Sequence, residues 1–131
     1  MDAIVAHQHG LTNAVALMGT SVNIRRIALI LRYCDRFTLC FDFDAAGTEA
    51  KMKAISSLHS FGVTSISEIA LPEGSDPDEY LTKFGAQSLV GLSKELSTQE
   101  IKKYVKAYDY MLEVRKKEAQ DARRERQNNV R

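Results

Sequence analysis

Two aspartates that follow an apolar segment give the sequence its clearest chemical signal. The chain reads LCFDFDAAGTEA from Leu39 onward, with Asp42 and Asp44 one residue apart. Side chains alternate along an extended backbone, so both carboxylates project to one side. Carboxylates at the carboxyl end of a buried strand lie where open α/β sheets bind ligands and metals. Hard oxygen ligands and accumulated negative charge favour Mg²⁺ or Mn²⁺ at this place.

Asp44 also has a purely structural interpretation. Aspartate is among the favoured N-cap residues, because its side chain accepts hydrogen bonds from the first amides of a helix. An Asp-x-Asp pair alone therefore does not distinguish a helix cap from a metal ligand. The order strand, Asp-x-Asp-x-x-Gly and helix, together with a second acidic segment downstream, favours the metal site.

The second acidic segment is LPEGSDPDEYL, which begins at Leu71. Its structural interpretation is a helix start, with Asp76 as N-cap, Pro77 at the first helical position and Glu79 closing a capping box. In a parallel sheet, the loops after successive strands gather at one edge. We therefore expect Asp76 and Asp78 to face the same crevice as the first aspartate pair, where either could supply a further metal ligand.

Helical and extended patterns alternate along the first two thirds of the chain. Helical spacing is found before Gly10, around Ile27 and before Gly62. We expect strands between and after these helices, at Asn13–Met18, Phe37–Asp42 and Ser65–Leu71. Such alternation predicts right-handed crossovers and a parallel sheet with helices on both faces.

The last third changes in character. Ser97 and Glu100 form a capping-box pattern, and an amphipathic helix is expected over residues 97–114. The segment 115–131 carries seven basic and three acidic residues, although the net charge of the whole chain is only +1. This basic charged tail could hold a polyanion through Lys and Arg contacts to phosphates. A solvated helix end without a binding role explains the same charges, and both interpretations stay open.

Composition narrows the class of protein. The 131 residues, 44% hydrophobic and 27% charged, suit one domain with an ordinary core. No apolar run approaches the roughly 18 residues that a membrane-spanning helix needs, so we expect no membrane association. Cys34 and Cys40 match no metal-binding spacing, and we interpret both as reduced core thiols of a cytoplasmic protein.

Three segments in this order and at these separations resemble the Toprim domain of bacterial DnaG-type DNA primases: MDAIVAHQHGLTNAVALMGTSV, LCFDFDAAGTEA and LPEGSDPDEYLTKFG. The resemblance covers residues 1–96. It implies a Toprim-like parallel sheet with flanking helices, followed here by a C-terminal helical extension. It also implies metal-dependent nucleotidyl transfer in DNA replication, in which a primosome enzyme makes RNA primers on a single-stranded DNA template from nucleoside triphosphates.

The resemblance assigns roles to particular residues. It implies that Asp42 and Asp44 are catalytic and bind magnesium (or manganese), and that Asp76 and Asp78 contribute to the same metal site. Four basic residues are candidates for contacts with template or nucleotide, although each is equally plausible as a solvated surface charge: Arg25, Arg26, Lys51 and Lys53.

The chain departs from the family pattern at three points. The first family strand and its glutamate are missing before Met1, Phe43 replaces a usual glycine, and Ala45 replaces a common arginine. The chain is then a piece of a longer primase, half of a split enzyme completed by an upstream primase fragment, or a degenerate relative. The alternative function is a non-catalytic module that binds nucleic acid or a replication partner such as the replicative helicase. A nuclease- or topoisomerase-like Toprim enzyme agrees less well with residues 71–85.

Overall fold

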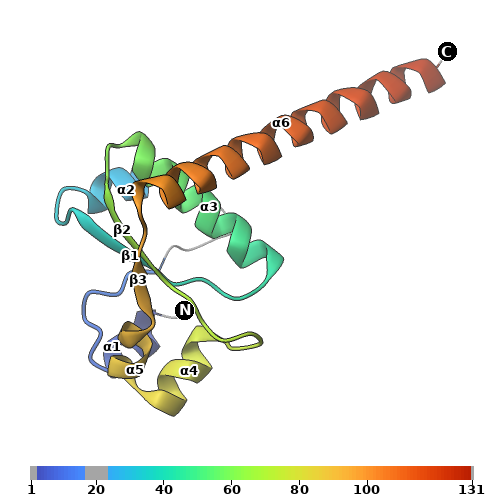
Figure 1. Cartoon of the computed structure of the whole chain (residues 1–131). Coiled ribbons are helices and arrows are strands. Elements are labelled where there is room, and N and C mark those ends of the chain that lie inside the picture. The colour runs from blue at the N-terminus through green and yellow to red at the C-terminus, as the bar shows by residue number, and fades with distance from the viewer. Residues whose placement is uncertain (1–2, 17–23, 131) are drawn as a thin grey trace.

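One sheet runs through the computed structural model, which describes residues 3–16 and 24–130. Its strands are β1 (Arg36–Leu39), β2 (Ser65–Ile69) and β3 (Ser93–Glu95), in the order β1-β2-β3 (Figure 1). β1 and β2 are parallel, with Arg36 opposite Ser65. β3 pairs antiparallel with β2, with Ser67 opposite Glu95. The expected α/β class with a parallel strand pair and flanking helices is confirmed, and β3 adds an antiparallel strand that the sequence did not predict. β3 was missed because its three polar residues are all exposed and carry no apolar alternation.

The first expected strand, Asn13–Met18, does not form in residues 13–16, which are the part of it that the structure describes. Residues 13–16 form a turn and irregular backbone, and residues 17 and 18 lie outside the described ranges. Within those ranges no strand pairs with the outer edge of β1, which would be the natural neighbour for an added strand. Residues 13–16 therefore have no hydrogen-bonded partner strand to hold them extended, and an isolated strand is not stable alone.

Helices form at the expected places before Gly10, around Ile27 and before Gly62, and the last helix is a long one. Their bounds are α1 (Ala3–Gln8), α2 (Ile24–Ile30), α3 (Ala45–Ser60), α4 (Pro77–Phe84), α5 (Ala86–Gly91) and α6 (Thr98–Asn129). α6 is continuous across the expected boundary at residue 114, so the basic tail is part of the same helix. Among the described residues, no helix combines the length and apolar character needed to cross a membrane.

Local capping signals set the helix starts. The Asp76 carboxylate accepts hydrogen bonds from the amides of Asp78 (2.7 Å) and Glu79 (3.4 Å), which begins α4. Ser97 and Glu100 form the expected capping box at the start of α6, with the Ser97 amide donating to the Glu100 carboxylate over 2.8 Å. Lys94, 2.8 Å from Glu100, helps to lower the pKa of that carboxyl to about 2. The N-cap role of Asp76, the place of Pro77 at the first helical position and the capping box of Ser97 and Glu100 are confirmed, whereas the structure gives Glu79 no capping-box hydrogen bond to Asp76.

Helices cover both faces of the sheet and enclose two separate hydrophobic clusters. Because side chains of a strand alternate, Ile66 and Ile69 of β2 point to opposite faces. Ile66 joins the cluster that α3 and α6 cover, around Ile55 and Leu58. Ile69 packs against the cluster that α1, α4 and α5 enclose around Leu81. In Figure 1, α2, α3 and α6 accordingly gather at one end of the molecule and α1, α4 and α5 at the other.

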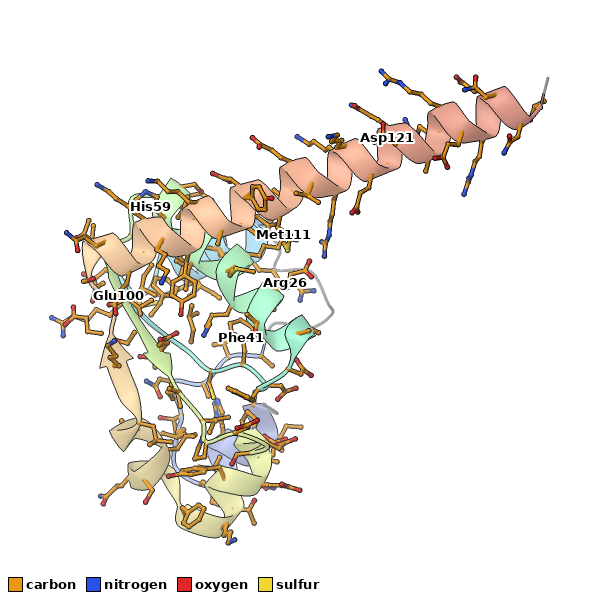
Figure 2. The ribbon with its side chains drawn as sticks, turned by 45° about the vertical axis from the view of Figure 1, so that its right-hand side comes forward. Arg26, Phe41, His59, Glu100, Met111 and Asp121 are labelled. Atoms are coloured by element: carbon orange, nitrogen blue, oxygen red, sulfur yellow. The ribbon has the colours of Figure 1, made fainter. Side chains whose placement is uncertain are left out.

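Polar contacts attach the first half of α6 to the domain. Lys51 of α3 lies 3.1 Å from the Glu68 carboxylate and 5.3 Å from the centre of the Tyr104 ring. Tyr104 also donates its hydroxyl hydrogen to Glu68 over 3.2 Å. Farther along, Arg115 forms a two-point ion pair with Glu49 at 2.6 and 2.8 Å. Beyond Arg115 the helix projects into solvent, and Figure 2 shows Asp121 on this projecting part. All described residues after Arg115 are exposed.

Candidate functional site

The two aspartates lie in the segment that joins β1 to α3. β1 ends at Leu39 and α3 begins at Ala45, so Asp42 and Asp44 occupy the turn itself rather than the strand end. Both side chains are exposed, and the ring of Phe43 between them is 59% exposed. The carboxylates are therefore accessible to a ligand from solvent, and Phe43 does not fill the protein interior.

Gly47 explains why the turn has this shape. The Asp44 carboxylate accepts a hydrogen bond from the Gly47 amide over 2.5 Å, which caps α3. The Gly47 backbone also packs so closely against the preceding turn that an added Cβ would lie 2.0 Å from the Asp42 carbonyl oxygen. No side chain fits at that distance. The pattern Asp-x-Asp-x-x-Gly is thus a single structural unit, in which the glycine holds the first turn of α3 against the backbone of Asp42.

Charges from both acidic segments affect the thiol of Cys40. Burial and, to a smaller extent, the charges of Asp42, Asp78 and Asp76 together raise the pKa of the Cys40 thiol from 9.0 to about 11. Such charge effects fade over about 10 Å in saline solution. Because β1 and β2 are parallel, the segments that follow them leave the same end of the sheet, which agrees with these charge effects. Cys40 itself is half-buried and reduced, whereas Cys34, expected in the core, is exposed.

The carboxylates do not form a large ligand cluster. Across residues 3–16 and 24–130, no group of three or more His, Cys, Asp or Glu side chains is close enough to hold one metal ion. Asp42, Asp44 and Asp76 are exposed and Asp78 is half-buried. Magnesium often takes only one or two protein carboxylates and completes its shell with water and substrate phosphates. The chemistry of the Asp42–Asp44 turn fits that smaller donor set.

The candidate nucleic-acid contacts are dispersed. Arg25 and Arg26 are exposed on α2, and Figure 2 shows Arg26 on the side of the molecule where α2 and α3 meet. Lys53 is half-buried on α3. The hydrogen bond from Arg115 and, to a smaller extent, the charge of Lys53 lower the pKa of the Glu49 carboxyl. Lys51 is held by Glu68 and Tyr104. Lys51 would have to leave its ion pair with Glu68 to contact a ligand.

The sequence and the fold of this chain are both similar to those of known proteins. A family model described as Toprim-like matches residues 1–81, which include all four candidate carboxylates. The chain belongs to the Toprim-like family. The solved Aquifex aeolicus primase, a structure of zinc-binding and RNA polymerase domains, superimposes with a TM-score of 0.62 at 35% identity. That match covers 69% of this chain and 23% of the Aquifex chain.

Bacterial DNA primases are similar in sequence to this Toprim-like chain. The DNA primase of Geobacillus stearothermophilus is 42% identical over 90 residues, which are 69% of this chain and 15% of that protein. The DNA primase of Lactococcus lactis subsp. lactis is 36% identical over 111 residues, which are 85% of this chain and 16% of that protein. The chain therefore spans about 15% of the length of these curated relatives.

The first prediction concerns the glycine of the turn. Gly47→Ala should destabilise the fold by roughly 1–3 kcal/mol, because the new methyl group forces either α3 or the Asp42 carbonyl to move. Urea unfolding followed by circular dichroism measures the loss. Gly91→Ala is the matched control, since a Cβ there meets nothing within 4 Å. Equal stabilities of the two variants would show that the close approach at Gly47 does not constrain the turn.

The second prediction concerns Cys40. In a Cys34→Ser background, the rate of alkylation by iodoacetamide should keep rising with pH beyond 9, because a thiol with a pKa of about 11 is still mostly protonated there. Adding Asp42→Asn should increase the rate at pH 9, since the removed charge had raised that pKa. A rate that levels off near pH 9 in both proteins would contradict the proposed surroundings of the thiol.

Proposed function

We propose that this chain is the Toprim catalytic part of a DNA primase, which performs metal-dependent nucleotidyl transfer for RNA primer synthesis. The observation that carries the proposal is the exposed Asp42–Asp44 turn, shaped by Gly47, at the carboxyl end of a strand in a Toprim-like domain. Sequence similarity to bacterial DNA primases supports the choice of reaction. The substrates would be a single-stranded DNA template and nucleoside triphosphates.

The aspartate turn suits Mg²⁺ or Mn²⁺. Asp42 has an exposed carboxylate, and Asp44 uses one oxygen to cap α3, which leaves the other oxygen for a metal. When bound, the ion would align the phosphates of the incoming nucleotide and offset negative charge on the departing pyrophosphate. Asp76 and Asp78 would add negative potential at the same end of the sheet. Arg25, Arg26, Lys51 and Lys53 are the proposed contacts to nucleotide or template, and Lys51 would leave Glu68 to make its contact.

The third prediction tests the metal site without depending on primer synthesis. Addition of Mg²⁺ should shift the backbone amide NMR signals of residues 42–47 and of the Asp76 loop in a saturable manner, and Mn²⁺ should broaden the same signals. Asp42→Asn should weaken Mg²⁺ binding at least about tenfold, because hard cations depend on charged oxygen ligands.

Asp35→Asn is the control for this titration. Asp35 is also exposed and precedes β1, at the opposite end of the strand. The control should leave the affinity for Mg²⁺ within about twofold, since charges separated by more than a Debye length are largely screened. Equal weakening by both substitutions, or no saturable shift in the folded protein, would refute the metal site.

A second candidate function is polyanion binding by the exposed end of α6. This segment continues the helix to Asn129, and all of its described residues are exposed, so its cations are presented to solvent on a rigid support. About 21 Å of helix follow Arg115 at a rise of 1.5 Å per residue. A nucleic acid could contact this segment without touching the aspartate turn, which makes the two functions separable.

The fourth prediction tests this segment with single-stranded DNA in a fluorescence anisotropy titration. A tail variant replaces Arg123, Arg124 and Arg126 by glutamine. It should bind more weakly, and the slope of log affinity against log salt concentration should decrease by about 2, because each phosphate contact on a single strand contributes about 0.7.

The control variant carries the same change in net charge on the attached half of the helix. It replaces Lys102, Lys103 and Lys106, which are exposed, by glutamine. This variant should keep most of the affinity of the unchanged protein. If both variants lose affinity and slope equally, binding depends on net charge alone, and the projecting segment has no specific role.

A further inference from the structure

The two turns that precede the parallel strands are neighbours at the amino end of the sheet. β1 begins at Arg36 and β2 at Ser65, and these two residues are paired in the register of the strands. Paired positions of adjacent strands lie about 4.8 Å apart. The turn from α2 to β1 and the turn from α3 to β2 therefore enter the sheet side by side, and Figure 1 shows both at the same end of it.

Each of these turns presents an aromatic ring to solvent. Tyr33, between α2 and β1, is 83% exposed, and Phe61, between α3 and β2, is 41% exposed. Among the described residues, neither ring belongs to the two hydrophobic clusters or to the side chains packed against them. Aromatic rings gain much from burial against other flat rings, so these two turns offer a partner two places to stack.

Positive charge surrounds the exposed tyrosine. Residues 24–36 include four arginines and one acidic residue, and residues 56–64 include no Lys, Arg, Asp or Glu. Arg32 and Arg36 are exposed, and within the described ranges neither takes part in an ion pair. Their guanidinium groups can therefore meet an anion beside an exposed ring. We call Arg32, Tyr33, Arg36 and Phe61 the amino-end surface.

The carboxylates of the candidate metal site lie at the opposite end of the sheet. The aspartate turn follows β1, and the Asp76 loop follows β2. β2 has five residues, which cover roughly 16 Å, about twice the Debye length at physiological ionic strength. These carboxylates therefore weaken the attraction of the amino-end surface for an anion very little.

We propose that the amino-end surface binds single-stranded nucleic acid, with bases stacked on Tyr33 and Phe61 and phosphates held by Arg32 and Arg36. Aromatic rings beside cations are the usual means of binding single strands, whose bases and phosphates are exposed together. A duplex keeps its base faces inside the stack and offers only phosphates. The surface is separate from the aspartate turn and from the projecting part of α6, so the proposal goes beyond both proposed functions.

The fifth prediction uses the fact that the sequence contains no tryptophan. In the tail variant, which minimises binding by the projecting part of α6, Tyr33→Trp introduces one fluorophore at the amino-end surface. A thymidine oligonucleotide should quench its fluorescence in a saturable manner, because the base stacks on the indole ring. Tyr110→Trp is the matched control, since Tyr110 is 71% exposed and lies on α6. The fluorescence of this control should not change.

Further substitutions separate stacking from charge in an anisotropy titration with the same oligonucleotide. Tyr33→Leu keeps an apolar side chain but removes the ring, and it should weaken binding at least about fivefold. Tyr33→Phe keeps the ring and should leave the affinity within about twofold. Replacing Arg32 and Arg36 by glutamine should decrease the slope of log affinity against log salt concentration by about 1.4, because each phosphate contact on a single strand contributes about 0.7.

Cys34 allows a chemical footprint of the same surface. Its exposed thiol lies between Tyr33 and Arg36 in the sequence, whereas the pKa of Cys40, about 11, keeps that thiol mostly protonated at neutral pH. When the oligonucleotide fills about nine tenths of the sites, alkylation of Cys34 by iodoacetamide should be slowed about tenfold. In Tyr33→Leu, the same oligonucleotide concentration should protect Cys34 less.

Three results would overturn the proposal. Fluorescence of Tyr33→Trp that is quenched no more than that of Tyr110→Trp would show that strands do not bind at the amino-end surface. Equal affinities of Tyr33→Leu and Tyr33→Phe would exclude stacking. Equal protection of Cys34 by polyglutamate or by duplex DNA would show that the surface recognises negative charge alone. Circular dichroism of each variant distinguishes a loss of binding from a loss of structure.

Discussion

The close approach of the Gly47 backbone to the Asp42 carbonyl is the constraint on which the rest of the site depends. With hydrogen in place of a side chain at residue 47, α3 can begin directly against the turn that leaves β1. Asp44 then falls at the N-cap, with its side chain accepting from the Gly47 amide. The direction of α3 that results carries Ile55 and Leu58 into the core above β2. One backbone contact therefore links the exposed carboxylates to the packing of the domain.

Local signals in the sequence were sufficient for the parts of the fold that depend on neighbouring residues. Asp76, and Ser97 with Glu100, cap the helices expected to follow them, since a cap needs only three or four consecutive residues. β3 and its antiparallel direction were not predictable in this way. Its residues are polar and exposed, and its place is decided by pairing with Ser67 and Ile69, far away in the chain.

The candidate site shows the same division between local and distant information. The pattern of residues 42–47 pointed to the aspartate turn, whereas the contact of Gly47 with the Asp42 carbonyl required coordinates. Lys51 illustrates the limit most clearly, because its partners Glu68 and Tyr104 come from a different strand and helix. Cys40 was expected to be a reduced core thiol; it is half-buried, and its pKa is raised mainly by burial and to a smaller extent by the charges of both acidic segments, which are distant in the sequence.

β1 and α3 meet at the aspartate turn, and both elements hold it in place. On one edge β1 is fixed by its parallel pairing with β2, and past its end the backbone is fixed by the close approach of Gly47 to the Asp42 carbonyl. The Asp42 side chain itself is exposed, so a cation bound there would restrain a carboxylate whose backbone is already ordered. Such a turn loses little further conformational freedom on binding, which favours affinity because ordering costs oppose it.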